Sequence, residues 1–357
     1  MPDLSGIAGD RELHSKSETL APQQQEAPQN RSLGIVGAGD IVTRLHLPVL
    51  EAMPNLRIAW ITDAREARAA AVGTAYKVPS IAMPADLEQL PQADVVLLAI
   101  PYGARAPYFA ALGGDRCALY VEKPFAKTVA EHLSLCQGRA PSRIACGFQR
   151  RAMTSVNLVR SLIEEQFFGA LEHVEFGLGR RGQVRSGTHQ SNVALAGGGM
   201  FFETGVHGLD AILYITGATD AQLQSASVTM LEGFEVHVDA AFRIASPREP
   251  SVPCRLVVSC LEDTIESFRF VFERAELRFS MYNNEPIRVR SRSGDRRFTI
   301  GRDGGGCVAT FYQTAFAYWR AFLDGLASQS ANWTSASDSV LTTKLVEQIF
   351  SQPHREL

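Results

Sequence analysis

The sequence predicts an α/β fold, with a doubly wound parallel sheet in the first part of the chain and an α+β domain in the second. Three observations support this prediction. Residues 33–42 form a short apolar run that breaks into glycines and continues as a helix, and strand and helix patterns then alternate as far as residue 147. Beyond residue 148, long strands follow one another without intervening helices, as in an antiparallel or mixed sheet.

The chain has 357 residues, which is longer than one hydrophobic core usually supports, so about two domains are expected. Residues 1–30 contain Ser, Gln, Pro, Glu and Asp without a hydrophobic period, and we interpret them as a disordered tail. The alternating pattern assigns residues 31–150 to the parallel-sheet domain. Residues 151–357 are assigned to the α+β domain.

The first domain is expected to hold about six strands joined by helices. Its strands are predicted at residues 33–36, 56–62, 78–82, 93–100, 118–121 and 142–147. Its helices are predicted after residue 39 and near residues 64–76, 86, 105–112 and 129–137. The strand at 93–100 is apolar on both faces, as a central parallel strand must be, and Pro101 ends it.

The second domain is expected to begin with a helix at about residues 153–166. A strand at 171–179, a Gly- and Arg-rich loop and a helix at 200–216 follow. Five strands come next, at residues 222–231, 235–245, 255–261, 267–272 and 276–279. Helices at about 308–328 and 337–351 close the chain.

Composition excludes several classes of protein. The net charge of -3 gives no general attraction to nucleic acid or to a membrane surface. No apolar run is long enough to span a bilayer, and the N-terminus lacks the order of a secretory signal. The six cysteines include no Cys-x-x-Cys pair and are expected to be free thiols in a reducing cytoplasm. No metal site is expected, because His237 and Asp239 have no third ligand near them in the sequence.

The glycine turn predicts a site for a dinucleotide. Gly37 permits a tight turn, Gly39 permits close approach of a phosphate, and the helix that starts at Asp40 and Ile41 presents backbone N–H groups. A bare Gly-x-Gly is more often an ordinary strand-to-helix turn. The second strand, however, ends at Asp63, where a carboxylate accepts hydrogen bonds from an adenosine ribose.

The triplet Glu122-Lys123-Pro124 follows a predicted strand at the carboxyl edge of the parallel sheet, where open α/β sheets bind ligands. A lysine there can stabilise negative charge on a substrate oxygen. A surface ion pair followed by a loop proline explains the same residues equally well.

The helix after Gly197-Gly198-Gly199 carries a second group of polar residues. Regular helical spacing puts Glu203, His207 and Asp210 on one stripe. His207 could exchange a proton with a hydroxyl or carbonyl near neutral pH, with Glu203 orienting it. The alternative is a partly buried histidine satisfied by a neighbouring carboxylate.

With these elements in order, the chain resembles the Gfo/Idh/MocA family of glucose-fructose oxidoreductase and inositol dehydrogenase. The resemblance covers residue 33 to the C-terminus and rests on four matches. They are the Gly-Ala-Gly turn followed by His46-Leu47-Pro48, the triplet at 122–124, the segment Gly147-Phe148-Gln149-Arg150-Arg151, and the glycine-rich helix that ends in His207-x-x-Asp210. The resemblance implies an N-terminal Rossmann domain, a C-terminal α+β domain with a large open sheet, a nicotinamide cofactor, and a homodimer or homotetramer.

The resemblance also implies roles for single residues. Lys123 stands at the active-site lysine, His207 at the acid/base histidine, and Glu203 where the family more often has Asp. The segment Ile100-Pro101-Tyr102 replaces the family's Thr-Pro-Asn beside the nicotinamide, and Arg105 lies near the place of an expected histidine. The residues expected to bind cofactor therefore also include Pro101, Glu122 and Lys123.

From these residues we predict an NAD(P)-dependent oxidoreductase that moves a hydride between nicotinamide and a secondary alcohol or ketone of a sugar, cyclitol or related polyol. Asp63 favours NAD because it would repel a 2′-phosphate, whereas Arg65 leaves NADP open. Two alternatives remain: a redox-neutral, NAD-dependent glycosidase or epimerase, and a non-catalytic NAD(P)-binding sensor.

The loop before the glycine-rich helix predicts an anionic substrate, such as a nucleotide-linked sugar. It contains Arg181 and Arg185, with His189 close by, and arginines of this kind bind phosphate or carboxylate groups. Solvated loop arginines are the alternative. The full set expected to contact substrate is Tyr102, Arg151, Arg181, Arg185, His189 and Asp210.

Overall fold

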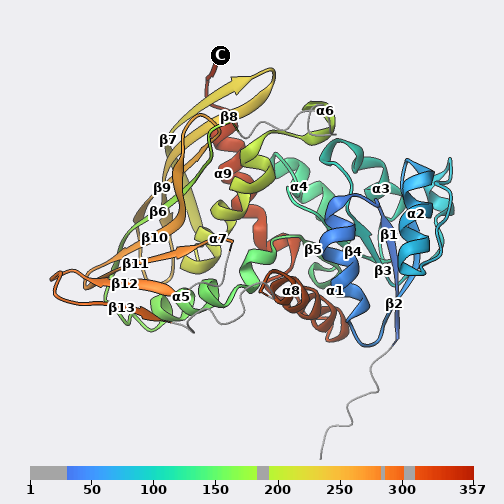
Figure 1. Cartoon of the computed structure of the whole chain (residues 1–357), viewed down its shortest axis with the longest axis horizontal. Coiled ribbons are helices and arrows are strands. Elements are labelled where there is room, and N and C mark those ends of the chain that lie inside the picture. The colour runs from blue at the N-terminus through green and yellow to red at the C-terminus, as the bar shows by residue number, and fades with distance from the viewer. Residues whose placement is uncertain (1–29, 183–192, 283–285, 301–309) are drawn as a thin grey trace, which may run out of the picture.

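The computed structural model describes residues 30–182, 193–282, 286–300 and 310–357 (Figure 1). The expected tail at residues 1–29 therefore lies outside the described residues. The predicted combination of a parallel, Rossmann-like sheet with a mostly antiparallel second sheet is confirmed. Within the described ranges, no helix has both the length and the apolar character that crossing a membrane requires.

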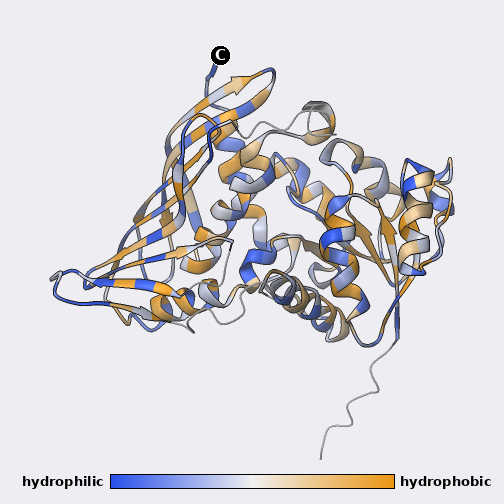
Figure 2. Cartoon of the chain, in the orientation of Figure 1, coloured by the Kyte–Doolittle hydropathy of each residue, from blue (hydrophilic) through white to orange (hydrophobic). Residues whose placement is uncertain are grey.

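The first sheet contains five parallel strands in the order β2-β1-β3-β4-β5. These strands are β1 (Arg31–Val36), β2 (Leu56–Thr62), β3 (Val95–Leu98), β4 (Ala118–Val121) and β5 (Ile144–Cys146). The intervening helices are η1 (Val42–His46), α1 (Leu47–Glu51), α2 (Glu66–Tyr76), η2 (Leu87–Gln89), η3 (Tyr102–Ala104), α3 (Ala106–Ala111), α4 (Val129–Cys136) and η4 (Pro141–Arg143). Every residue of β3, β4 and β5 is buried, and Figure 2 shows the central strands of this sheet as predominantly hydrophobic.

One predicted strand of this sheet is absent. Residues 78–82 do not form a sixth strand, and they make only an isolated bridge between Ile61 and Ser80. The N–H of Ile61 donates to Pro79 O and the N–H of Ile81 donates to Ile61 O. Pro79 has no N–H of its own, so the ladder cannot continue through it.

The second sheet contains nine strands in the order β13-β12-β11-β10-β6-β9-β8-β7-β14. Its strands are β6 (Leu171–Gly179), β7 (Asp220–Leu231), β8 (Phe234–Ala245), β9 (Val252–Ser259), β10 (Thr264–Phe272), β11 (Ala275–Ser280), β12 (Ile287–Ser291), β13 (Arg297–Ile300) and β14 (His354–Glu356). The pairs β6·β9 and β7·β14 are parallel, and the other neighbours are antiparallel. The strands β12, β13 and β14 were not predicted; they are short and lie toward the two ends of the sheet.

The remaining helices are η5 (Gln149–Ala152), α5 (Thr154–Glu164), α6 (Val193–Ala196), η7 (Phe201–Gly205), α7 (Val206–Thr216), α8 (Thr310–Ala327), η9 (Ala336–Ser339) and α9 (Val340–Phe350). In Figure 1, α7 and α9 lie between the nine-stranded sheet and the parallel sheet. The helix predicted at 200–216 is interrupted, because residues 201–205 form a π-helical turn before α7 begins.

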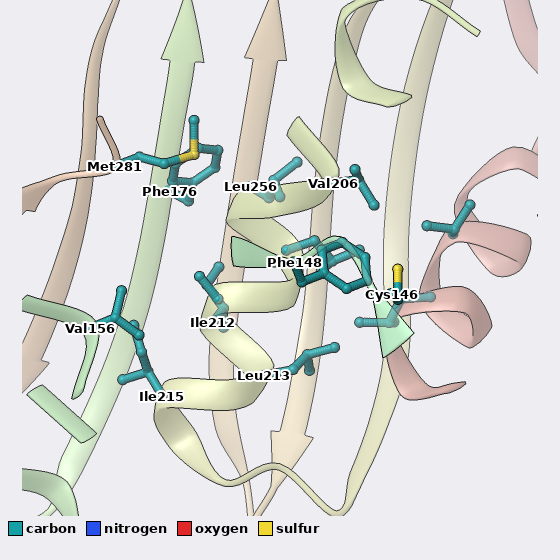
Figure 3. Packing of buried hydrophobic residues seen from close by; sticks show 14 of the residues in the cluster. Cys146, Phe148, Val156, Phe176, Val206, Ile212, Leu213, Ile215, Leu256 and Met281 are labelled. Atoms are coloured by element: carbon teal, nitrogen blue, oxygen red, sulfur yellow. The ribbon is translucent and has the colours of Figure 1, made fainter. Parts of the chain in front are cut away.

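Helix α7 is buried along almost its whole length. Figure 3 shows Ile212 and Leu213 of α7 among the buried hydrophobic side chains of one cluster, which also includes Leu256 of the sheet and Phe148, which follows β5. Gly208 lies against the sheet, and a Cβ atom at this position would stand 2.3 Å from the ring of Phe176. A glycine is therefore required for the close approach, which fixes the helix that carries His207.

Helix α8 lies beyond residue 150 in the sequence but packs against the parallel sheet. Trp319 stacks on Tyr120 of β4 with ring centroids 4.1 Å apart, and Phe322 joins the same cluster. We predicted that residues 31–150 and 151–357 form separate domains, but α8, which belongs to the second range, packs on the sheet of the first.

A buried histidine joins α4 to α9. His132 is completely buried, its Nε2 lies 3.0 Å from Ala336 O, and its Nδ1 lies 2.7 Å from Thr343 Oγ1. Because a carbonyl only accepts, Nε2 carries the proton and the Thr343 hydroxyl donates to Nδ1. Burial lowers the pKa of His132 to about 4, although the Ala336 carbonyl favours the charged form.

We expect this histidine to make the protein sensitive to acid. Its pKa is about 4 when folded and 6.5 when unfolded, so the unfolded state binds more protons between these values and stability falls as the pH falls through that window. At pH 5 the loss is about 2 kcal/mol relative to pH 7. Urea unfolding of His132→Gln should lack this part of the pH dependence, whereas His173→Gln, a change at a partly exposed histidine, should retain it. Equal pH dependence in all three proteins would contradict the assignment.

Candidate active site

The turn after β1 leaves open space beside a helix N-terminus. Gly37 has φ of +101°, its N–H donates to Thr62 O at 2.8 Å, and a Cβ there would stand 2.4 Å from Ala99 O. Gly39 differs, because a Cβ there would meet nothing within 4 Å. The helix begins at Asp40 and continues through Ile41, and the first N–H groups of a helix have no partner within it. This turn fits a phosphate group.

Asp63 connects the glycine turn to the end of β2. Its Oδ2 accepts from the N–H of Ala38 and its Oδ1 accepts from the N–H of Arg65, both at 2.8 Å. Each carboxylate oxygen can accept a second hydrogen bond, so both remain able to receive a ribose hydroxyl. The residues predicted to hold a dinucleotide therefore lie around one turn, with the exposed Arg65 immediately before α2.

Arg105 ties together the ends of two neighbouring strands. It is 5% exposed, and its guanidinium donates to Ile100 O after β3 and to Lys123 O and Pro124 O after β4. Burial lowers the pKa of Arg105 to about 10, against the opposing effect of Glu122. Arg105, which lies near the place of an expected histidine, thus positions the segment after β3 that contains Pro101 and the segment after β4. The second segment contains the Lys123–Pro124 bond, which is cis.

Tyr102 is held by α4. Its hydroxyl donates to Glu131, at 2.7 Å from Oε1 and 2.6 Å from Oε2, while Lys127 Nζ lies 5.3 Å from the ring centroid. A Cβ at Gly197 would stand 3.0 Å from this side chain. Burial and Glu131 raise the pKa of Tyr102, so its hydroxyl stays protonated. The glycine run before α7 therefore packs against the first domain.

Glu122 is a buried carboxylate with two donors. Its Oε1 lies 2.9 Å from His46 Nε2 and 3.0 Å from Gln149 Nε2. Trp319 Nε1, which can only donate, lies 3.0 Å from His46 Nδ1, so the proton of the neutral imidazole sits on Nε2 and points to Glu122. Burial would raise the pKa of Glu122, but the hydrogen bond from His46 and the nearby cations outweigh it and lower the pKa. Glu122 is therefore ionised beside Lys123.

Lys123 reaches from the parallel sheet to the start of α7. Its Nζ donates to the main-chain oxygen of Glu203. Burial lowers the pKa of Lys123, as do the charges of Arg105 and Arg150, while Glu122 and Glu203 act in the opposite direction. The lysine therefore stands where the carboxyl edge of the first sheet meets the helix of the second domain.

His207 lies in the first turn of α7 and is 7% exposed. Its ring stands edge-on to Phe148 with centroids 5.9 Å apart, and its Nδ1 has no hydrogen-bond partner in the part of the chain that the structure describes. Burial, Lys123 and Arg150 lower the pKa of His207 well below its ordinary value. The imidazole is therefore neutral at pH 7.

The expected partnership of Glu203 with His207 does not follow from helical spacing. The π-helical turn at 201–205 breaks the regular period on which a shared stripe depends, and among the described residues His207 Nδ1 has no hydrogen-bond partner. The main-chain oxygen of Glu203 accepts a hydrogen bond from Lys123, and the charge of Glu203 also acts on this lysine.

Arg151 and Asp210, both expected at the substrate, instead bind each other in the interior. Arg151 is 3% exposed and Asp210 is completely buried, with Arg151 Nη2 to Asp210 Oδ1 at 2.6 Å and Nε to Oδ2 at 2.8 Å. Thr342 Oγ1 donates to Asp210, and Arg151 also donates to Trp333 O and Asp338. A fully buried carboxylate with these partners cannot reach a substrate, so this ion pair positions α7.

Arg150 was not among the residues expected at the site. It is 8% exposed, its Nε has no partner among the described residues, and no hydrogen bond or ion pair involves its guanidinium there. The sequence signal was two adjacent arginines at 150–151, and nothing in their order shows which one pairs internally.

Of the residues expected to bind substrate from the arginine-rich loop, only Arg181 lies in the described part of the chain. The N–H of Arg181 donates to Asp263 Oδ1 at 3.0 Å, and its side chain is exposed. Arg185 and His189 lie outside the described residues.

Comparison with known proteins gives two family matches. The model for an oxidoreductase family with an NAD-binding Rossmann fold matches residues 31–140, and the model for the GFO/IDH/MocA C-terminal domain matches residues 156–278. A putative UDP-kanosamine synthase oxidoreductase subunit from Amycolatopsis mediterranei is 28% identical over 185 residues. The chain spans about half the length of this curated relative, at 51% of each chain.

Three solved structures share the fold. KijD10, a 3-ketoreductase from Actinomadura kijaniata in complex with NADP and TDP-benzene, superposes with a TM-score of 0.76 at 18% identity, covering 92% of this chain and 98% of that one. An aldose-aldose oxidoreductase from Caulobacter crescentus complexed with glycerol gives 0.73 at 17% identity, covering 90% and 96%. An oxidoreductase from Agrobacterium radiobacter in complex with NAD+, L-tartaric acid and magnesium gives 0.73 at 16%, with the same coverage.

Proposed function

Because the chain belongs to the GFO/IDH/MocA family of NAD(P)-binding oxidoreductases, we propose that it transfers a hydride between nicotinamide and a secondary alcohol or ketone of a sugar, cyclitol or nucleotide-linked sugar. One observation carries the proposal. Lys123 follows β4 at the carboxyl edge of the parallel sheet and donates to Glu203 O just before α7, the helix that carries the neutral, buried His207, and the charge of Lys123 acts on this histidine. This pair can accept a proton and stabilise an oxyanion at the same place.

His207 is the proposed acid/base. In the direction of oxidation, the neutral imidazole accepts the proton of the reacting hydroxyl, while the ammonium of Lys123 stabilises the negative charge that develops on that oxygen. In the direction of reduction, the proton returns from the imidazolium to the carbonyl oxygen. Because the pKa of His207 is lowered, the neutral imidazole is the form that is present at neutral pH, and this form can accept the proton in the direction of oxidation.

The turn at Gly37 and Gly39 and the carboxylate of Asp63 would hold the dinucleotide. The open space beside Gly39 and the free accepting positions of Asp63 fit its phosphates and ribose. The nicotinamide group, when bound, supplies or accepts the hydride. Pro101, Glu122 and Lys123 line the adjoining strand ends, and Asp63 favours NAD over NADP because it repels a 2′-phosphate.

Neighbours that act on or bind sugar-like molecules support the carbohydrate class. The curated relative is described as a subunit for UDP-kanosamine synthesis, and KijD10 is a 3-ketoreductase crystallised with a TDP compound. By the same family resemblance we propose a homodimer or homotetramer, which light scattering would measure.

Hydride transfer can be measured by the absorbance of reduced nicotinamide. The protein should be mixed with NAD, and separately with NADP, and a panel of hexoses, cyclitols, sugar acids and nucleotide sugars. We expect one class of substrate to reduce the cofactor, and NAD to support a higher kcat/KM than NADP. Boiled protein and protein without substrate are the controls.

Product analysis separates the remaining functions. Turnover detected by chromatography without net NADH would identify a redox-neutral glycosidase or epimerase and replace the dehydrogenase. Binding of NAD without any product across the panel would favour a sensor and count against the proposal.

A further inference from the structure

Arg150 is a buried cation that forms no ion pair with any of the described residues. Its side chain extends from η5, and the guanidinium carbon lies 5.0 Å from the ring centroid of Phe311 and 5.8 Å from that of Tyr282. Only 8% of the residue is exposed. The described residues place no carboxylate within ion-pair distance of it, whereas the adjacent Arg151 has two.

Such a group is unfavourable unless an anion reaches it. Aromatic faces offset part of the desolvation of a guanidinium, but they do not accept its five in-plane N–H donors. Burial lowers the pKa of Arg150 to about 10, and the Tyr282 hydroxyl opposes this only in part. The planar fork of donors matches a carboxylate or a phosphate better than any other ligand.

Arg150 directly follows two residues that contact the proposed reacting groups or their neighbours. Phe148, two residues earlier, contacts the ring of His207, and Gln149 donates to Glu122, the neighbour of Lys123. The charge of Arg150 also acts on both Lys123 and His207. The glycine turn that fits the dinucleotide phosphates begins at the end of β1, so Arg150 is not needed to bind the phosphates of the cofactor.

We propose that Arg150 binds an oxyanion of the substrate itself, a carboxylate or a phosphate group, while the reacting carbon of the substrate lies at Lys123 and His207. This inference rests on the proposed function, because it names the substrate class of the same site. It selects sugar acids, sugar phosphates and nucleotide-linked sugars over neutral hexoses and cyclitols.

Binding measurements test the inference without hydride transfer. Calorimetric titrations with D-glucuronate, glucose 6-phosphate and UDP-glucose, each in the presence of NADH, compare the carboxylate with the two phosphate sources. D-glucose is the neutral probe. The proteins are wild type, Arg150→Met, Arg150→Lys and Arg288→Met, the last of which removes an exposed arginine of β12.

We expect at least one anion to bind wild type and to lose about 10- to 100-fold in affinity in Arg150→Met, the range that follows from lost charge-assisted hydrogen bonds. The anion affinity of Arg150→Lys should lie between those of wild type and Arg150→Met, because lysine keeps the positive charge but lacks the planar fork of N–H donors. Arg288→Met should match wild type, and D-glucose should bind all four proteins alike. NADH binding and circular dichroism verify that each variant is folded.

Two results would overturn the inference. One is anion binding no tighter than that of D-glucose, and the other is equal anion affinity in wild type and Arg150→Met. These outcomes are distinct from failure of the proposed function. Hydride transfer from neutral sugars alone would support the oxidoreductase function and contradict the proposed role of Arg150. Anion binding that depends on Arg150, without any turnover, would support the role of Arg150 and count against the oxidoreductase function.

Discussion

Replacing Lys123 with Met should lower kcat by roughly 10²- to 10³-fold, the range typical of losing one donor that stabilises the negative charge developing on the reacting oxygen. The side chain keeps its approximate volume but loses the ammonium that donates to Glu203 O and stands beside Glu122. Steady-state rates with the substrate found in the hydride-transfer panel measure the effect. NADH binding, followed by its fluorescence, should remain because the glycine turn is unchanged.

Lys344→Met is the matched control for this prediction. Lys344 is partly exposed on α9 and pairs with Asp220 at 2.7 Å, away from the strand ends that form the site. Its replacement should leave kcat within about twofold of wild type, since such pairs contribute little. If Lys123→Met and Lys344→Met retained the same kcat, Lys123 would not take part in the reaction.

Replacing Asp210 with Asn should lower the free energy of unfolding by about 3–5 kcal/mol, because it leaves the guanidinium of Arg151 buried without its bidentate partner. Both residues are almost inaccessible to solvent, and the pair fastens α7 to η5. Urea unfolding followed by circular dichroism measures the loss. Activity should fall as well, because α7 carries His207 in its first turn.

Asp338→Asn provides a control on the other side of the same arginine. Asp338 Oδ2 lies 3.0 Å from Arg151 Nη1, but its side chain is 55% exposed, so solvent can replace it. We expect its loss to cost at most about 1 kcal/mol. Equal destabilisation by the two substitutions would mean that burial of the Asp210 pair does not determine its contribution.

Much of the fold could be predicted from local patterns. The apolar run of β1, its glycine turn and the fully buried β3 and β4 followed from hydrophobic periodicity, because strands covered on both faces have few alternatives. The strand expected at residues 78–82 failed where Pro79 interrupts the ladder. The edge strands β13 and β14 were missed because short strands carry too few residues for a periodic signal.

The candidate site was predictable in its residue types but not in its partnerships. The motifs predicted Lys123 and His207 as site residues, and Lys123 donates to Glu203 O just before the helix that carries His207. Spacing could not show that residues 201–205 would form a π-helical turn, which changes the helical period between Glu203 and His207. Arg151 was expected at the substrate, although its side chain is bound to the buried Asp210.

The sequence by itself determined the two kinds of sheet, the glycine turn and the identity of the lysine and the histidine, because these depend on neighbouring residues in the chain. Only the tertiary structure decided that Arg150 finds no anion among the described residues, that α8 joins the parallel sheet through Trp319, and that Trp319 fixes the proton of His46 toward Glu122. Those outcomes depend on which groups far apart in sequence are buried together. Burial sets both the electrostatic cost of a charge and the partners available to offset it, and neither quantity is a property of a local segment.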